Sequence, residues 1–296
     1  MRLLITGWQG QLARSIAEAA TRRSEITALS IGRPALDLCA RPSILRTLAD
    51  NAPDIIVNTA AYTAVDKAER ERDAAFALNR DGAGLLAEAA AARGVPIIHV
   101  STDYVFDGAK TTPYVETDAT APLNVYGASK LAGEQVVAAA NRRHVILRTA
   151  WVHSPFGQNF VKTMLRLAGE RPRLKVVADQ LGNPTYAPHL AAAILDIALS
   201  LPGRGDSDPA WGLYHAAGSG ETSWHGLACA VFARSRALGG PAVEVDPIPA
   251  ASYPTAAARP TNSRLDCSRL QAQFGLHLPD WQDGAADCVT RLLQPL

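Results

Sequence analysis

The sequence predicts an α/β fold, a Rossmann-type doubly wound parallel sheet with a smaller mixed C-terminal substrate lobe. Three observations support this prediction. Short apolar runs alternate with helical stretches through the first half of the chain, a glycine-containing turn joins the first run to the first helix, and the alternation breaks after about Trp151. Alternating strands and helices are typical of parallel sheets with right-handed crossovers.

The elements of the first half follow from local pattern. Strands are expected where short apolar runs occur, at 2–6, 26–31, 54–58, 95–101 and 144–149. Helices are expected between them, at 11–22, 42–52, 73–93 and 126–141. The third helix is alanine-rich and is closed by Gly94, a usual residue at a helix end.

The second half has a different rhythm. Helices are expected at 160–170, 188–201, 222–236, 266–274 and 281–293, with a short strand at 174–177 and a loop at 201–209. We therefore expect a dinucleotide-binding domain at 1–150, with 172–202 returning to it. The substrate-binding lobe is expected at 151–171 and 203–296.

Composition excludes several classes of protein. The 296 residues are 48% hydrophobic and 19% charged, enough for a sizeable core, and the net charge of +1 does not favour nucleic acid or an anionic membrane as a partner. The four cysteines are scattered, so neither a zinc site nor a disulfide framework follows, and no metal site is expected. No apolar run reaches the roughly 18 residues of a membrane helix, and the N-terminus lacks a signal pattern. A cytoplasmic location is expected.

The turn after the first expected strand reads Gly7-Trp-Gln-Gly10-Gln-Leu-Ala13. Gly7 permits a tight turn, Gly10 lets the backbone approach a pyrophosphate, and the helix that follows offers free N–H groups and a positive dipole end. An ordinary glycine-rich strand–helix turn is the plain alternative. The position of the segment 7–13 directly after the first expected strand favours dinucleotide binding.

The end of the second expected strand indicates which cofactor is bound. An acid there grips the ribose 2′-hydroxyl of NAD, but this segment ends in Gly32-Arg33 and carries no acid. A guanidinium attracts a 2′-phosphate, so NADPH is expected, with NADH as the alternative. Arg33 as a solvated loop residue is the competing interpretation.

Tyr126 and Lys130 are four residues apart in an expected helix. That spacing stacks both side chains on one face, about 6 Å apart along the axis. Lowering a tyrosine pKa from about 10 to about 7 takes roughly 4 kcal/mol. A cation about 4.5 Å away supplies about that much at an effective dielectric of about 20. We expect Lys130 to lower the pKa of Tyr126 and make it a proton donor for a carbonyl; a surface lysine beside a half-buried tyrosine is the alternative.

Two further strand ends carry small or polar side chains. The segment 58–63 suits a wall along the ribose and diphosphate of the cofactor. Thr102 follows the fourth strand, at the sheet edge where ligands of open α/β sheets bind. Thr102 is expected to donate to the same carbonyl oxygen as Tyr126, although a threonine at a strand end also caps the next turn.

Together these segments resemble the extended short-chain dehydrogenase/reductases. The resemblance runs over nearly the whole chain and includes GWQGQL, DIIVNTAAYTAVDKAE, STDYVFDG, PLNVYGASKLAGE, LRTAWV, NFVKTMLRLA, DQLGNPT, GLYHAAG and YPTAAARPTNSRL. It implies an NAD(P)H-dependent reductase that acts on the 4-keto group of a dTDP-linked sugar. A related epimerase or reductase of another nucleotide sugar is an alternative, and a non-catalytic NADP-binding regulatory subunit is a third.

The resemblance also implies site residues. The implied catalytic set is Thr102, Tyr126 and Lys130. Implied cofactor contacts, in addition to Arg33, come from Gly7, Gln9, Gly10, Gln11, Leu12, Asp37, Leu38, Ala60, Ala61, Tyr62, Asn79, Tyr126 and Lys130. Implied substrate contacts come from Val65, Asp66, Thr102, Asp103, Tyr126, Trp151 and Arg259. A core tryptophan, a helix-capping aspartate and a surface arginine are the plain interpretations of Trp151, Asp66 and Arg259.

One departure from the family concerns metal. Some relatives are dimers bridged by Mg²⁺ on glutamate side chains, one of them early in the first helix. Here that stretch reads Ala13-Arg14-Ser15, with no acid before Glu18. A metal-bridged dimer is therefore not expected, and the chain is expected to be a monomer or a homodimer.

Overall fold

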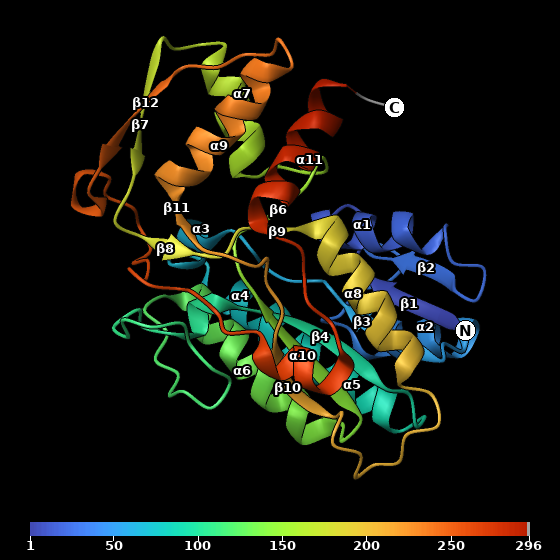
Figure 1. Cartoon of the computed structure of the whole chain (residues 1–296). Helices are drawn as coiled ribbons and strands as arrows, with labels where there is room; N and C mark the ends of the chain where they lie inside the picture. Colours follow the sequence, from blue (N-terminus) through green and yellow to red (C-terminus); the bar gives the residue numbers. More distant parts are fainter. Residues whose placement is uncertain (295–296) are drawn as a thin grey trace.

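The structure, a computed structural model, describes residues 1–294, and its centre is a parallel sheet of six strands (Figure 1). The strand order is β10-β5-β4-β3-β1-β2. The strands are β1 (Arg2–Thr6), β2 (Thr27–Ile31), β3 (Ile55–Asn58), β4 (Ile97–Thr102), β5 (His144–Thr149) and β10 (Gly212–His215). The order reverses direction between β1 and β3. In an open parallel sheet, ligands bind at such a reversal, outside the carboxyl ends of the strands.

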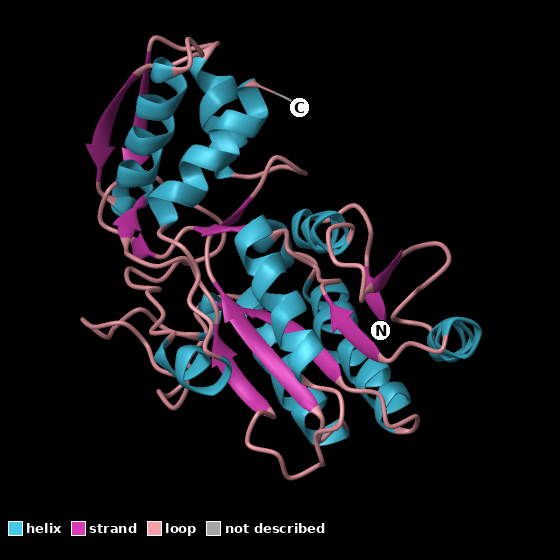
Figure 2. Cartoon of the chain, turned by 45° about the vertical axis from the view of Figure 1, so that its right-hand side comes forward, coloured by secondary structure: helices cyan, strands magenta, loops and turns pink. Residues whose placement is uncertain are grey.

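Helices cover both faces of this sheet (Figure 2). Because successive side chains of a strand point to opposite faces, Leu3 and Ile5 join one core while Leu4 joins the other. The first core contains residues of α1 (Gln11–Ala20), α8 (Ala187–Ser200) and α10 (Ser268–Phe274). The second contains residues of α2 (Arg41–Asn51), α5 (Ala83–Ala91) and α6 (Val125–Ala140). The doubly wound fold expected from the sequence is confirmed.

The helix expected at 73–93 is interrupted in its middle. It consists of α4 (Arg72–Phe76), a π-helical segment (Ala77–Gly82) and α5, and it follows the short α3 (Val65–Ala68). The π segment turns the buried Asn79 toward the loop after β3. Single π turns of this kind are frequent at functional sites. Within residues 1–294 we find no helix with the length and apolar character needed to cross a membrane.

A smaller lobe stands beside the carboxyl ends of the strands, at the upper left of Figure 1. Its core is formed by α7 (Phe160–Ala168), α9 (Trp224–Ala237), α11 (Trp281–Leu293) and the parallel pair β7 (Arg173–Val177) and β12 (Glu244–Ile248). The connecting chain forms the short pairs β6 (Val152–His153) with β9 (Thr185–Tyr186), and β8 (Leu181–Gly182) with β11 (Thr222–Ser223). A 3₁₀ turn (Ala250–Ser252) follows β12.

The boundary between sheet and lobe differs from the expectation at three segments. Residues 212–215, expected in the lobe, form β10 at the edge of the main sheet. Residues 268–274, also expected in the lobe, form α10, which packs beside β10. Residues 173–177, expected to return to the first domain, form β7 in the lobe. The reason is burial: Tyr214 of β10 is fully buried in the sheet core, whereas Leu174 and Val176 of β7 are buried in the lobe core. The division into two domains otherwise stays a prediction.

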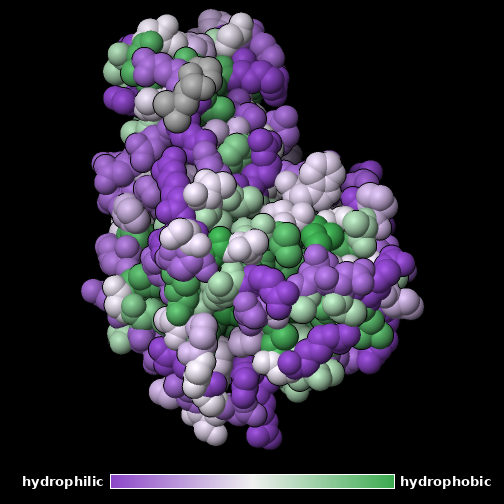
Figure 3. Space-filling model, turned by 90° about the vertical axis from the view of Figure 1, so that its right-hand side faces the viewer, coloured by the Kyte–Doolittle hydropathy of each residue, from purple (hydrophilic) through white to green (hydrophobic). Residues whose placement is uncertain are grey.

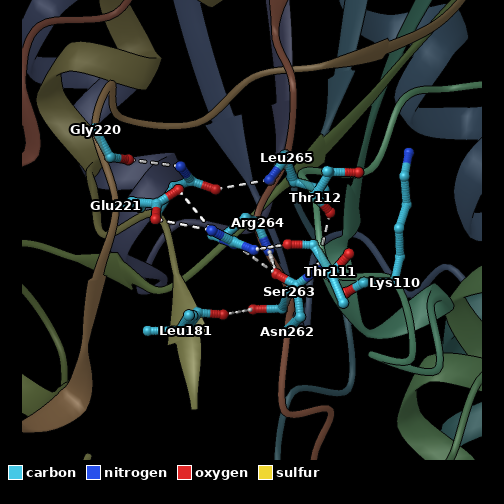
Figure 4. A network of polar contacts seen from close by, with 11 residues as sticks. Lys110, Thr111, Thr112, Leu181, Gly220, Glu221, Asn262, Ser263, Arg264 and Leu265 are labelled. Atoms are coloured by element: carbon cyan, nitrogen blue, oxygen red, sulfur yellow. Dashed lines mark hydrogen bonds and ion pairs between the residues drawn. The ribbon is translucent and has the colours of Figure 1, made fainter. Parts of the chain in front are cut away.

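The segment 260–265 ties the lobe to the sheet (Figure 4). The Arg264 guanidinium donates to both carboxylate oxygens of Glu221, at 2.8 and 2.9 Å, and to the Thr111 carbonyl at 2.5 Å. The Asn262 amide donates to the carbonyls of Lys110 and Thr112, at 2.6 and 3.0 Å. Bidentate hydrogen bonds between a guanidinium and a carboxylate are stronger than neutral hydrogen bonds and fix the relative geometry of the two groups. Ser263 lies between Asn262 and Arg264, and its hydroxyl contacts the Leu181 carbonyl at 3.3 Å.

We expect removal of the Tyr214 side chain in β10 to destabilise the whole protein. Tyr214 is fully buried, so Tyr214→Ala leaves a cavity in the sheet core and lowers the free energy of unfolding by about 3–5 kcal/mol. Tyr253 is 60% exposed, so Tyr253→Ala changes it by about 0.5 kcal/mol or less. Urea unfolding of both variants tests this. Equal losses would contradict the placement of β10 in the core.

Candidate active site

A cleft of about 480 Å³ opens at the carboxyl ends of the strands, between the sheet and the lobe. Its wall contains residues that follow β1 and β3, the ends of β4 and β5, and the first residues of α6. The predicted site residues that line it are Gln9, Gly10, Gln11, Leu12, Ala61, Val65, Thr102, Asp103, Tyr126, Lys130 and Trp151. Those that lie outside its wall are Gly7, Arg33, Asp37, Leu38, Ala60, Asp66, Tyr62, Asn79 and Arg259.

The turn from β1 into α1 has the features that a dinucleotide requires. Gly7 has φ +89°, a conformation that side chains disfavour, and a Cβ added at Gly10 would meet no described atom within 4 Å. No side chain among residues 1–294 caps the N-terminus of α1, which leaves its backbone N–H groups available. These residues therefore fit the pyrophosphate of a nicotinamide dinucleotide.

The Gln11 side chain joins this turn to the lobe. Its amide nitrogen donates to the Val152 carbonyl at 3.3 Å, and its oxygen accepts from Ser154 at 2.9 Å and from Asn159 at 2.8 Å. Asn159 is the N-cap of α7. The predicted cofactor contact of Gln11 can therefore come from its backbone, while its side chain fixes the angle between α1 and the lobe.

The region after β2 lies beyond the cleft wall. The Arg33 guanidinium donates to Asp37 Oδ1 at 3.0 Å, and Asp37 also accepts from the Cys39 backbone N–H. The hydrogen bond from Cys39 lowers the pKa of Asp37, and Arg33 acts in the same direction. Arg33 is exposed and lies just after the end of β2, where it is paired with Asp37. Leu38, in contrast, is buried in the second sheet core.

Asn79 holds the loop after β3 rather than facing the cleft. Its side-chain oxygen accepts from the Tyr62 backbone N–H at 2.8 Å, and its amide donates to the Tyr62 carbonyl and to Ser129 Oγ, at 3.1 and 2.9 Å. Ser129 donates in turn to the Tyr126 carbonyl at 2.8 Å. Asn79 thus connects the predicted ribose wall to the helix that carries Tyr126.

Tyr126 is placed by the first turn of α6. Asn124 caps this helix by accepting from the Gly127 backbone N–H at 2.8 Å. A Cβ added at Gly127 would lie 2.1 Å from the Tyr104 carbonyl oxygen, so only glycine allows the helix to approach the turn after β4 this closely. This contact brings Tyr126 beside Thr102 in the same cleft.

Lys130 is buried one turn further along α6. Its Nζ donates to the Val100 carbonyl of β4 at 2.6 Å. Burial lowers the pKa of Lys130 to about 8, and the nearby carboxylate of Glu134 opposes this shift. Glu134 itself accepts from Ser101 at 2.5 Å and from Arg148 at 2.9 and 2.7 Å. A buried ion pair therefore lies behind the lysine.

The expected lowering of the Tyr126 pKa was wrong. Burial raises the pKa of Tyr126 to about 12, and the Thr102 side chain, not Lys130, is the neighbour that opposes the rise. The sequence argument counted only the attraction of a nearby cation and omitted the loss of solvation of the phenolate. A phenol with a raised pKa keeps its proton at neutral pH, as a proton donor must.

Asp103 is the other acid in the cleft. Thr102 Oγ1 donates to Asp103 Oδ1 at 3.0 Å, and the carboxylate is only 3% exposed. Burial raises the pKa of Asp103 to about 7, with Ser263 and Thr102 opposing the rise. Its Oδ2 atom has no hydrogen-bond partner in the described part of the chain.

Trp151 forms an aromatic wall with a residue that the sequence analysis missed. Its ring stacks on Trp224 at 3.5 Å between centroids and 4° between planes, and its Nε1 donates to Ser263 Oγ at 3.2 Å. Trp151 has φ +48°, which is strained for a bulky residue, and such strain is found at functional sites. Trp224 follows Ser223, the N-cap of α9; this capping pattern was the only signal for it in the sequence.

A second cavity of about 860 Å³ lies in the lobe, and Trp224 lines both cavities. Asp66 and Arg259, which the sequence places far apart, meet in its wall, where the Arg259 guanidinium donates to Asp66 at 2.8 and 3.2 Å. This ion pair joins α3 to the loop after β12. Residues 1–294 contain no group of three or more His, Cys, Asp or Glu side chains that could hold a metal ion.

A comparison of the whole chain identifies its family. Residues 1–294 match the family model described as the RmlD substrate binding domain. The chain belongs to this family. The resemblance expected from the sequence, and with it the extended short-chain dehydrogenase/reductase fold, is confirmed.

Named relatives of the RmlD family match along their full length. The dTDP-4-dehydrorhamnose reductase of Sinorhizobium fredii is 52% identical over 293 residues, 99% of this chain and 98% of that protein. That of Escherichia coli K12 is 43% identical over 305 residues, covering 100% of this chain and 98% of that protein.

Solved structures agree with this assignment. The dTDP-4-dehydrorhamnose reductase of Bacillus anthracis in complex with NADP superposes with a TM-score of 0.90 at 36% identity, covering 97% of this chain and 98% of that one. A UDP-glucose 4-epimerase of Thermus thermophilus in complex with NAD superposes with a TM-score of 0.81 at 22% identity, with full coverage of both chains, which shows the fold alone.

The ionisation of Asp103 predicts a pH-dependent stability. Its pKa is about 7 in the folded protein against 3.8 for an ordinary aspartate, so only the unfolded chain loses this proton between those values. The contribution of Asp103 to stability is therefore complete below about pH 4 and is lost as the pH rises to about 7. At roughly 1.4 kcal/mol for each pKa unit, the loss is about 4 kcal/mol.

Comparison with an asparagine variant isolates this contribution. Urea unfolding of the natural protein and of Asp103→Asn between pH 5 and pH 8 should show the variant gaining stability relative to the natural protein as the pH rises. Buried histidines titrate equally in both proteins and cancel in the difference. A difference that does not change with pH would contradict the raised pKa.

Proposed function

We propose that this chain reduces the 4-keto group of dTDP-4-dehydro-L-rhamnose to give dTDP-L-rhamnose, with NADPH as the reductant. The observation that carries the proposal is the convergence of Thr102, Tyr126 and Lys130 in one cleft with the glycine turn before α1. The names of the relatives supply the substrate, and the bound NADP of the Bacillus anthracis structure supports the cofactor.

Each residue of the cleft has a chemical task in this reaction. NADPH, when bound, supplies a hydride to the sugar C4. Tyr126 donates its proton to the carbonyl oxygen as negative charge develops there, and Thr102 orients that oxygen beside the phenol. Lys130, held by the Val100 carbonyl, provides positive charge near the phenolate that remains. General-acid catalysis of this kind contributes about 10²–10⁴-fold to the rate.

The two cavities suit the two ends of a sugar nucleotide. The sugar would lie in the first cleft, against Val65, Asp103 and Trp151. The diphosphate and thymidine would extend past Trp224 into the lobe cavity, whose wall carries the basic side chains Arg171, Arg173, Lys175 and Arg259. Cations favour a diphosphate, and distant contacts of this kind supply orientation at the reacting carbon. We further propose that the protein is cytoplasmic and that it acts as a monomer or a homodimer without a bridging metal.

Replacing the proposed proton donor tests the reaction directly. Mixing the protein with NADPH and dTDP-4-dehydro-L-rhamnose should consume the reduced nicotinamide, followed by its absorbance. Tyr126→Phe lowers kcat by about 10²–10⁴-fold while the Kd for NADPH stays nearly unchanged, because only the transferable proton is lost. Tyr114→Phe is the matched control, since its hydroxyl bonds Asp107 away from the cleft. Full turnover by the Tyr126 variant would remove the assignment.

Cofactor preference depends on Arg33. A hydrogen bond to a charged group contributes about 1.5–3 kcal/mol, so Arg33→Ala should weaken NADPH binding by about ten- to a hundredfold. NADH lacks the 2′-phosphate, and its Kd should stay nearly constant. Calorimetric titration of both cofactors measures this, with Arg41→Ala, which removes a surface partner of Glu88, as the control. Equal weakening of both cofactors would contradict a 2′-phosphate contact.

A further inference from the structure

Trp8 is an exposed tryptophan in the turn between β1 and α1, and neither the fold nor the reaction described above accounts for it. Its side chain is 51% exposed, although an indole is among the largest apolar groups that a chain can bury. Single exposed apolar residues are common and need no explanation by themselves. The place of Trp8 does need one, because Gly7 and Gly10 on either side of it belong to the turn that fits a pyrophosphate.

The indole of Trp8 is held against the residues that follow β2. Gly7 donates its backbone N–H to the Ile31 carbonyl at 2.7 Å, which fixes the turn to the last residue of that strand. A Cβ added at Gly32 would lie 2.7 Å from Trp8 Cδ1 and 3.3 Å from Trp8 Nε1, so a side chain at this position would displace the indole. Trp8 Nε1 donates to the Arg33 carbonyl at 3.4 Å. The ring is therefore placed by the chain itself, and a ligand that uses it has little side-chain ordering left to do.

Two segments that recognise a dinucleotide meet at this ring. In Rossmann-type folds the pyrophosphate lies at the first glycine turn, and the adenosine ribose lies beside the residues that follow the second strand. Trp8 belongs to the first of these segments and packs against Gly32 and Arg33 of the second. A flat aromatic surface thus lies between the sites for the pyrophosphate and for the adenosine.

We propose that Trp8 stacks on the adenine of the nicotinamide dinucleotide. Every base offers a π face, and an aromatic side chain that stacks on it needs no hydrogen bond to the base. Trp8 and Arg33 then divide the recognition of the adenosine, because the ring contacts the base while the guanidinium attracts the 2′-phosphate. This inference rests on the proposed function, which supplies NADPH as the ligand.

A protein partner fits this surface less well than a nucleotide does. Among residues 1–294, the other large apolar side chains that are exposed are Leu123 and Tyr253, and neither belongs to the turn or to the segment after β2. The neighbours of Trp8 include Arg33, which is exposed and paired with Asp37. The cores of protein interfaces are depleted of charged residues, whereas a nucleotide brings phosphates next to its base.

Binding measurements with three ligands test the stacking. Trp8→Ala should weaken the binding of NADPH, NADH and adenosine 2′,5′-bisphosphate by a similar factor, about ten- to a hundredfold, because all three carry the adenine. Trp8→Phe keeps an aromatic face and should stay within about fivefold of the natural protein. Arg33→Ala, in contrast, should leave the Kd for NADH nearly constant. Because Trp8 is exposed, each variant should fold, and urea unfolding verifies this.

The fluorescence of an etheno derivative of adenosine 2′,5′-bisphosphate reports the contact itself. An indole stacked on the etheno-adenine quenches its emission, so the natural protein should quench this ligand at saturation. Trp8→Phe should restore most of the emission while the ligand stays bound. Trp211→Phe is the matched control and should quench like the natural protein. Trp211 precedes β10 at the amino ends of the strands, where its Nε1 donates to the Gly205 carbonyl at 2.7 Å.

The remaining outcomes overturn either the stacking or the function beneath it. Unchanged Kd values in Trp8→Ala, or equal quenching by the natural protein and Trp8→Phe, would overturn the stacking alone. A loss of affinity for NADPH without a loss for adenosine 2′,5′-bisphosphate would show that Trp8 does not contact the adenine. A change in sedimentation of Trp8→Ala with no change in Kd would assign this surface to a second copy of the chain. A natural protein that binds neither NADPH nor NADH would remove the proposed function itself.

Discussion

The close approach of α6 to β4 is the constraint on which the rest of the site depends. A Cβ added at Gly127 would lie 2.1 Å from the Tyr104 carbonyl oxygen, so no side chain fits there, and one turn later Lys130 donates to the Val100 carbonyl at 2.6 Å. Both contacts fix the helix to the strand that ends in Thr102. The phenol, the ammonium and the threonine hydroxyl are therefore held on rigid elements, and rigid elements keep reacting groups in productive geometry.

The same approach requires charge to be buried, and the structure compensates for it locally. Lys130 is 2% exposed, and four residues later Glu134 accepts two hydrogen bonds from Arg148 and one from Ser101. A buried ion pair is worth little to stability when its desolvation is counted, so stability alone does not explain its presence. The effect of the pair on Lys130 explains its presence. Burial lowers the pKa of Lys130, and the Glu134 carboxylate opposes this shift. The pair keeps positive charge available beside Tyr126.

The sequence predicted those features that depend on neighbouring residues. The turn at 7–10 and the alternation of strands and helices are local patterns, and the structure has both. The spacing of Tyr126 and Lys130 is local as well, and both residues line the cleft. The sequence could not predict β10, because this strand has only two apolar residues. It could not predict β12 either, because β12 contains Pro247 and proline is normally confined to edge strands. The Asp66–Arg259 pair joins positions 193 residues apart. The pKa of Tyr126 was misjudged because burial, a property of the whole fold, exceeds the effect of one cation.

The relation between the two cavities explains why the chain needs its lobe. Trp224 belongs to both cavity walls and stacks on Trp151, whose backbone is held in a strained conformation at the end of β5. That strain persists only if surrounding contacts determine it, and the contact from Trp151 to Ser263 comes from the segment that Arg264 ties to both parts of the molecule. A ligand bound in the lobe cavity would contact Trp224, which stacks on Trp151 in the wall of the cleft. Binding energy from the distant cavity can thus be used to orient the reacting carbon, which is how enzymes convert remote contacts into rate.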